Sequence, residues 1–161
     1  MAIETRYGNA LDVQTGIIVH GCNCLGVMGA GIALEIKNRF PMAFHEYDKV
    51  HRSRGLKLGE ICFAEITTNK FIINANTQQG IGGPTRQVSY DAIADCFHEI
   101  VKFAKVVEQH RGIKLEIVFP AIGAGLGGGD WKIIAAIIDV VVPSDYTKVL
   151  YLLPQLSSII E

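Results

Sequence analysis

The stretch that decides the fold is HGCNCLGVMGAGI, residues 20–32. It follows a short β-branched run at residues 16–20, which is typical of a buried strand, and it precedes helical spacing over residues 32–39. A helix that begins here exposes free N–H groups at the positive end of its dipole. Glycines let an anion reach those groups without meeting a Cβ. The Gly-Lys-Ser/Thr ending of a Walker A loop is missing, so the stretch is either a phosphate cradle or a plain strand-to-helix turn.

A second glycine-rich stretch, PAIGAGLGGGDW at residues 120–131, has the same setting. It follows an apolar run at 115–119 and precedes a helix that Asp130 can cap. Its glycines satisfy G-x-G-x-x-G, but the acidic residue that a dinucleotide fold places after the next strand is missing. Two such loops at neighbouring strand ends can clamp a diphosphate between them, and the sequence therefore predicts a paired anion cradle.

The rest of the chain alternates between strand and helix patterns. We expect strands at residues 3–7, 16–20, 61–66, 71–74, 115–119 and 149–153, and helices at 32–39, 42–54, 89–109 and 130–141. The turn at residues 67–70 joins two strands as a hairpin, so the sheet is mixed. These patterns predict one α/β domain over residues 1–161, with three layers (α/β/α) around a mixed, roughly six-stranded central sheet.

Composition narrows the classes of function. Of 161 residues, 49% are hydrophobic and 19% charged, which excludes wholesale disorder. A formal charge of −1 gives little support for direct binding to nucleic acid. No apolar run is long enough to cross a bilayer and no secretory signal pattern is present, so we expect a cytoplasmic protein without membrane contact. The four cysteines lack zinc-site spacing, and we expect reduced thiols, no metal and no cofactor.

With these features, the chain resembles the macrodomain family, whose members are α/β/α modules that bind ADP-ribose. Both glycine-rich stretches and the opening Tyr7-Gly8-Asn9-Ala10 carry the resemblance, which covers essentially the whole chain. The first stretch is similar to the branch that contains ADP-ribose-1″-phosphate phosphatases and terminal ADP-ribose–glutamate glycohydrolases. That branch has the pattern seen here as His20-x-Cys22-Asn23-Cys24 followed by Gly29-Ala30-Gly31-Ile32.

The resemblance implies a ligand-binding surface. The segment 8–10 would meet the adenine, at a position where relatives often carry Asp in place of Asn9. The backbone of 29–32 would hold the distal ribose and a phosphate, and the loop 123–128 would wrap the other side of the diphosphate. The implied ligand-binding residues are Gly8, Asn9, Ala10, Gly21, Cys22, Gly29, Ala30, Gly31, Ile32, Ile122, Gly123, Ala124, Gly125, Leu126, Gly127 and Gly128.

Three side chains are implied in catalysis. His20, expected at a strand end in the ligand cleft and near half-ionised at neutral pH, would act as general acid/base or nucleophile; a structural histidine is the alternative. Asn23 would face the distal ribose. Asp130 would be the cap of the following helix or a catalytic acid. The remaining histidines, at positions 45, 51, 98 and 110, are expected on solvated helix surfaces.

The leading function implied is a phosphatase that converts ADP-ribose 1″-phosphate to ADP-ribose and phosphate. One alternative is a non-catalytic module for ADP-ribose or a cyclic relative. Another is a de-ADP-ribosylating hydrolase, but the glutamate glycohydrolases use a lysine after the fourth strand, where this chain reads NTQQG at 76–80. Lys70, before that strand, should not reach the site. The glycines at 80–83 form either a mobile rim or an ordinary turn.

Overall fold

The computed structural model describes residues 2–125 and 127–161, which build a six-stranded sheet in the order β1-β6-β5-β2-β4-β3. The strands are β1 (Glu4–Tyr7), β2 (Gly16–Cys22), β3 (Ile61–Thr67), β4 (Lys70–Asn76), β5 (Ile117–Phe119) and β6 (Lys148–Leu152). All neighbouring pairs are parallel except β3 and β4, which form the antiparallel hairpin. The predicted mixed sheet is therefore confirmed.

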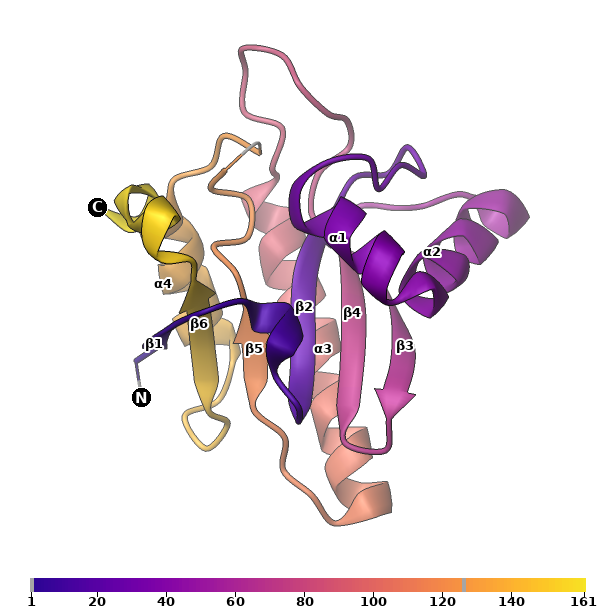
Figure 1. Cartoon of the computed structure of the whole chain (residues 1–161), viewed down its shortest axis with the longest axis vertical. Helices are drawn as coiled ribbons and strands as arrows, with labels where there is room; N and C mark the ends of the chain where they lie inside the picture. The colour runs from indigo at the N-terminus through magenta and orange to yellow at the C-terminus, as the bar shows by residue number, and fades with distance from the viewer. Residues whose placement is uncertain (1, 126) are drawn as a thin grey trace.

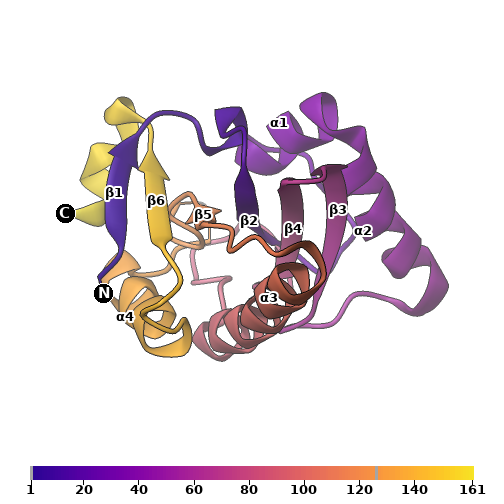
Figure 2. The same ribbon diagram turned by 90° about the horizontal axis from the view of Figure 1, so that it is seen from below.

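Helices cover both faces of the sheet (Figure 2). Helices α1 (Gly31–Arg39) and α2 (Pro41–Arg54) lie on one face, and α3 (Tyr90–Arg111) and α4 (Trp131–Val141) lie on the other. Two short 3₁₀ helices, η1 (Ala10–Asp12) and η2 (Pro154–Ile160), complete the described elements. The largest core cluster lies between the sheet and the α3/α4 layer, where Phe97, Phe119 and Trp131 pack together. The three-layer prediction is confirmed.

The helix boundaries follow local chemistry that the sequence displays. Pro41 opens α2, where its missing N–H costs nothing. The Ser89 side chain accepts a hydrogen bond from the Ala92 N–H and caps α3. Gly112 ends α3 in the left-handed conformation, with φ at +68°. Within the described residues, no helix combines the length and apolar character needed to span a membrane.

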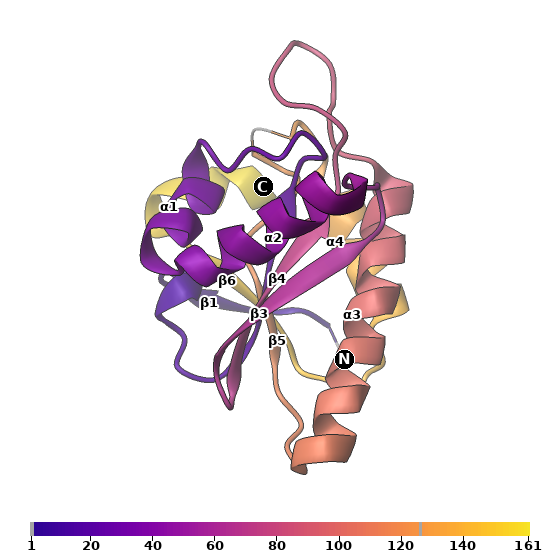
Figure 3. The same cartoon turned by 90° about the vertical axis from the view of Figure 1, so that its right-hand side faces the viewer.

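Parallel pairing brings the carboxyl ends of β2, β4 and β5 to one edge of the sheet. The loops that follow these strands, residues 23–30, 77–89 and 120–130, lie together at the upper edge in Figure 1. The same loops stand above the layers in Figure 3. We call this region the loop edge. Open α/β sheets bind ligands outside the carboxyl ends of their strands, so a ligand site is expected at the loop edge.

Candidate functional site

The three loops of the loop edge are tied to one another by backbone hydrogen bonds. Gln87 and Val88 donate their N–H groups to the carbonyl oxygen of Gly127, at 2.9 and 3.2 Å. The Cys24 N–H donates to Gln79 O at 3.1 Å. Loops that are far apart in the sequence therefore form a single surface.

Two glycines leave this surface open. A Cβ added at Gly31 or at Gly125 would meet no other atom within 4 Å. Gly31 also has φ at +56°, which side chains rarely adopt, and it begins α1 without any side-chain cap. The first N–H groups of α1 are therefore left for another acceptor. At these two glycines the backbone is open to the close approach of an anion.

The inner glycines of the second loop serve packing instead. A Cβ at Gly127 would lie 2.8 Å from the carbonyl oxygen of Gly123, and one at Gly123 would lie 2.7 Å from Val88 Cγ2. Gly21 is similarly enclosed, because a Cβ there would stand 2.8 Å from Thr77 Oγ1. These glycines let the loops and β2 approach closely, which in turn keeps Gly125 at the surface.

The predicted ligand-binding residues differ in how far they are exposed. Ala10, Cys22, Ile122 and Gly127 are buried. Gly8, Asn9, Gly21, Ile32, Gly123 and Ala124 are half-buried, while Gly29, Ala30, Gly31, Gly125 and Gly128 are exposed. Leu126 lies outside the described residues. Direct contact with a ligand stays a prediction, and the exposed residues are the ones that can make it.

His20 does not lie where the sequence predicts. β2 continues to Cys22, so His20 sits inside the strand, pairs with Asn74 of β4, and has no exposed surface. Its Nε2 atom lies 2.6 Å from Asn74 Oδ1. The Asn74 amide nitrogen donates to Ala43 O of α2, so Oδ1 is the acceptor and Nε2 carries the proton. His20 thus links the sheet to α2.

The ionisation expected for His20 is also wrong. Burial disfavours the charged imidazole and lowers the pKa of His20 to about 4, although the Asn74 hydrogen bond acts in the opposite direction. The side chain is neutral at pH 7. A catalytic role for His20 stays a prediction, and this geometry favours the structural alternative.

The amide of Asn23 is already used in hydrogen bonds to its own loop and to α2. Its Oδ1 accepts from the Leu25 N–H at 2.9 Å and from the Tyr47 hydroxyl at 2.9 Å, and its Nδ2 donates to Val27 O at 2.8 Å. Only 8% of the residue is exposed. Asn23 therefore shapes the first loop. The predicted contact of its amide with the distal ribose stays a prediction, and these hydrogen bonds weigh against it.

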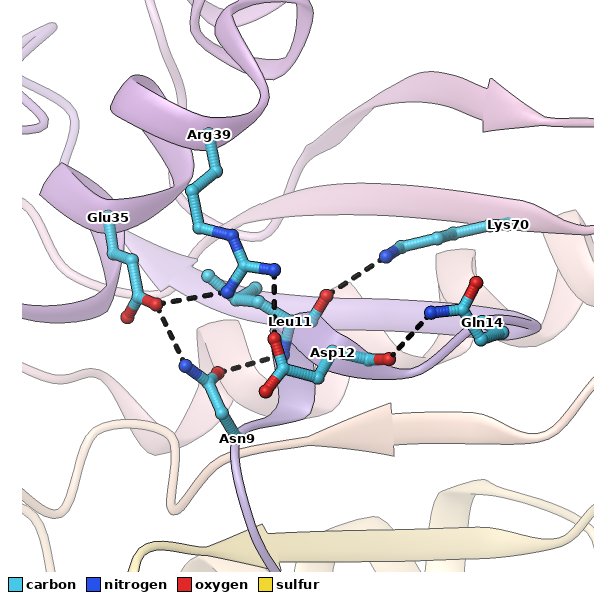
Figure 4. A network of polar contacts seen from close by, with 7 residues as sticks. All are labelled: Asn9, Leu11, Asp12, Gln14, Glu35, Arg39 and Lys70. Carbon is cyan, nitrogen blue, oxygen red and sulfur yellow. Dashed lines mark hydrogen bonds and ion pairs between the residues drawn. The ribbon is translucent and has the colours of Figure 1, made fainter.

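Asn9 belongs to a polar network that joins η1 to α1 (Figure 4). Its Oδ1 caps η1 by accepting from the Leu11 N–H, and its Nδ2 donates to Glu35 Oε1 at 2.8 Å. Arg39 then bridges Glu35 and Asp12. The network fixes the helix whose first residue is the open Gly31.

Asp130 caps α4, which confirms one of its two predicted roles. Its Oδ1 accepts from the Lys132 N–H at 2.9 Å, and its own N–H donates to the Tyr90 hydroxyl at 3.0 Å. The residue is exposed. In the described part of the chain, Oδ2 has no protein partner, so the carboxylate can both cap the helix and face solvent at the loop edge.

Charge is scarce at the loop edge. Residues 23–30, 77–89 and 120–130 contain one acidic side chain, Asp130, and one basic side chain, Arg86. The Arg86 guanidinium lies over the Tyr90 ring, 4.2 Å from its centre. No motif in the sequence points to Arg86 or Tyr90, although Arg86 is the one basic residue in the three predicted loops.

Lys70 lies far from the loop edge. It is the first residue of β4, at the opposite end of that strand, and its Nζ donates to Leu11 O at 2.9 Å. The four cysteines are free thiols, of which Cys22, Cys24 and Cys96 are buried. Histidines 45, 51, 98 and 110 are exposed, as predicted.

A shallow groove of about 500 Å³ lies elsewhere on the molecule. It follows the edge strand β3 and the start of α2, and it is lined by Met42, Glu46 and residues 61–65. None of the predicted ligand-binding residues lines it. The loop edge is the stronger candidate site, because no lysine or arginine is among the described residues that line the groove, and the groove lies apart from both glycine-rich loops.

Comparison with known proteins agrees with this architecture. The chain is 36% identical to an uncharacterized 17.5 kDa protein of Enterobacteria phage T4, over 81% of this chain and 82% of that protein. It is 29% identical to a DNA ADP-ribosyl glycohydrolase of Mycobacterium tuberculosis over 78% of this chain, and spans about a third (34%) of that longer protein. It is 28% identical to an ADP-ribose 1″-phosphate phosphatase of Candida albicans, over 72% of this chain and 75% of that one.

Solved structures show the same fold. A protein of unknown function from Bacteroides thetaiotaomicron superposes with a TM-score of 0.83 at 26% identity, over 95% of this chain and all of that one. The macrodomain of Mycobacterium tuberculosis DarG gives 0.73 at 25% identity, over 92% and 96%. The family model described as Macro domain matches residues 19–138, which include the end of β2, both glycine-rich loops and most of α4. The chain belongs to the macrodomain family.

Proposed function

We propose that this chain binds ADP-ribose at the loop edge and hydrolyses ADP-ribose 1″-phosphate to ADP-ribose and inorganic phosphate. The observation that carries the proposal is the pair of open glycines, Gly31 and Gly125, on separate loops of one edge. Membership of the macrodomain family supports the ligand class, and the Candida albicans relative supports the reaction.

The diphosphate is the part of ADP-ribose that this geometry suits. Its oxygens need several N–H donors, and close approach of backbone requires the absence of Cβ atoms. The uncapped N-terminus of α1 supplies donors on one side, and the open backbone at Gly125 allows close approach on the other. The binding energy comes mainly from backbone groups, so side-chain substitutions that leave the glycines intact should change affinity little.

We assign the proton transfer to Asp130, because it is the one acidic residue in the three loops of the loop edge. A water molecule attacks phosphorus and forms a new P–O bond while the bond from phosphorus to the ribose oxygen breaks. Asp130 takes the proton from water and returns it to that oxygen, which balances the reaction. His20 and Asn23 support the site by holding β2 and its loop in place.

A second candidate is the release of ADP-ribose from DNA, favoured by the similarity to the Mycobacterium tuberculosis glycohydrolase. Both reactions would use the same diphosphate cradle, and they differ in the bond that is broken. Absence of lysine in NTQQG at 76–80 weighs against a lysine nucleophile in this chain.

The test combines calorimetry with a phosphate-release assay. The wild type should bind ADP-ribose and release phosphate from ADP-ribose 1″-phosphate. Gly125→Glu should lose both activities without unfolding, because its side chain enters open space and carries like charge. Val140→Glu is the control. It adds the same charge at a residue that is 85% exposed and lies near the C-terminal end of α4, and it should change neither activity. Unaltered ADP-ribose affinity in Gly125→Glu would show that the cradle is misplaced.

An ADP-ribosylated oligonucleotide provides the second arm of the assay. Release of free ADP-ribose from it, with no phosphate released from ADP-ribose 1″-phosphate, would replace the phosphatase proposal by the glycohydrolase. If the protein binds ADP-ribose but releases neither phosphate nor free ADP-ribose in these assays, it is a non-catalytic binding module.

A further inference from the structure

Arg86 is the basic side chain of a loop edge on which only one acidic side chain is present. None of the ion pairs found in the described part of the chain includes Arg86. The residue is exposed. A positive charge beside a glycine loop, without a carboxylate to neutralise it, remains available to an anionic ligand.

The position of Arg86 is set by contacts on two sides. Its guanidinium stacks over the Tyr90 ring, and the Tyr90 hydroxyl accepts the N–H of Asp130. Its backbone packs on the second glycine loop, since a Cβ at Gly128 would lie 3.4 Å from Arg86 Cα. The Gly128 N–H in turn donates to the carbonyl oxygen of Gly125 at 3.1 Å. Arg86, Asp130 and the open Gly125 therefore share one corner of the loop edge.

We propose that Arg86 recognises the terminal phosphate of ADP-ribose 1″-phosphate and so makes the site prefer this phosphomonoester over ADP-ribose. The inference rests on the proposed function, because it presumes that the diphosphate lies on the glycine loops. Guanidinium matches phosphate with paired N–H donors, and these charge-assisted bonds are stronger than neutral ones. ADP-ribose lacks the extra phosphate, so only the phosphorylated ligand gains from Arg86.

Tyr90 is a positioning residue in this arrangement. Its ring holds the planar guanidinium and reduces the side-chain freedom that Arg86 would lose on binding. Its hydroxyl accepts a hydrogen bond from the Asp130 backbone N–H. Tyr90 therefore contacts both Arg86, which would bind the phosphate, and Asp130, which would transfer the proton.

The test compares two constants for each variant: KM for ADP-ribose 1″-phosphate and the inhibition constant of the product, ADP-ribose. Arg86→Gln should raise KM about tenfold, the loss expected for one charge-assisted contact at an exposed site. The inhibition constant for ADP-ribose should stay within about twofold of the wild type. Arg52→Gln, which removes an exposed arginine from α2, is the matched control and should change neither constant.

Two further readouts separate recognition from a structural role. A phosphomonoester gains its second charge with a pKa near about 6, so the advantage of wild type over Arg86→Gln should shrink as the pH falls from 7.5 to 5. Tyr90→Phe keeps the ring and should retain the preference for the phosphorylated ligand, while Tyr90→Leu should lose part of it.

The outcomes distinguish the inference from the proposed function. If the wild type binds neither ligand, the proposed function fails and the inference fails with it. If the wild type turns over the substrate while Arg86→Gln keeps the same KM, or if both constants rise equally, the inference is wrong and the proposed function stands. An effect of Arg86→Gln that is confined to an ADP-ribosylated oligonucleotide would also overturn it, since the phosphate recognised would then be a nucleic-acid diester.

Discussion

At the scale of the residue, the buried neutral His20 makes stability depend on pH. The free histidine has a pKa of about 6.5, and burial lowers the pKa of His20 to about 4 in the folded protein. Between these values the unfolded chain binds more protons, so stability is fully present above pH 6.5 and is lost as the pH falls toward 4. The loss between pH 7 and pH 5 should be about 2 kcal/mol.

Urea unfolding of the wild type and His20→Gln between pH 7 and pH 5 measures this effect. Glutamine does not titrate, so the variant should be less stable at pH 7 and lose less stability as the pH falls. If the free energy of unfolding changed equally with pH in both proteins, the lowered pKa of His20 would be contradicted. The sequence-based prediction of a half-ionised imidazole would then stand.

Asp130 carries the second prediction at this scale. Asp130→Asn keeps an oxygen that can accept the Lys132 N–H, so α4 stays capped, but an amide cannot relay a proton. Phosphate release should fall by about 10²–10⁴-fold with little change in ADP-ribose affinity. Thermal melts serve as the control for folding, and turnover within a few-fold of wild type would remove Asp130 from the mechanism.

What the sequence predicts of these residues depends on how local their interactions are. The cap at Asp130 is local, since the acceptor and donor are two positions apart. The placement of His20 is not, because glycine at position 21 has weak intrinsic strand preference, and pairing with β4 extends β2 past His20. Its partner Asn74 is 54 positions away.

At the scale of the element, the network between η1 and α1 can be tested by replacing the Asn9 amide with a carboxylate. Asn9→Asp would place a carboxylate against Glu35 Oε1, where the Asn9 amide now donates at 2.8 Å. The change removes a hydrogen bond and sets two like charges together, and it should lower the free energy of unfolding by about 1 kcal/mol.

Adding Glu35→Gln to Asn9→Asp supplies a donor opposite the new carboxylate and should recover most of that loss. A double-mutant cycle in urea measures the coupling. Additive effects of the two substitutions would show that Asn9 and Glu35 do not depend on each other. Coupled effects would show that the Asn9 amide is selected by Glu35.

The positions of the helices and of the hairpin can be predicted from the sequence. Periodicity and caps place α2, α3 and α4 within a few residues, and the turn at 67–70 predicts the antiparallel hairpin. The contact between the loops after β4 and β5 does not follow, because the Gly127 carbonyl and the Gln87 N–H meet only once the strands are assembled. For the same reason, no local pattern separates the packed glycines of the second loop from the open Gly125.

At the scale of the whole molecule, the loop edge draws on three strands of one sheet, and a ligand held there should stabilise the entire domain. A ligand that binds only the folded state adds RT ln(1 + [L]/Kd), which is about 2.7 kcal/mol at a hundredfold excess over Kd. For a chain of this length, about 1 kcal/mol corresponds to roughly 2–4 °C in Tm. ADP-ribose at that excess should therefore raise the Tm of the wild type by roughly 5–10 °C.

The same measurement on two glycine variants separates the cradle from the fold. Gly125→Glu should melt near the wild-type temperature and show no shift with ADP-ribose, because its side chain meets no protein atom within 4 Å. Gly127→Ala should melt lower without ligand, since its Cβ would press to 2.8 Å from the Gly123 carbonyl oxygen. If both variants lost stability equally and kept equal ligand shifts, the division of this loop into an open outer and a packed inner part would be wrong.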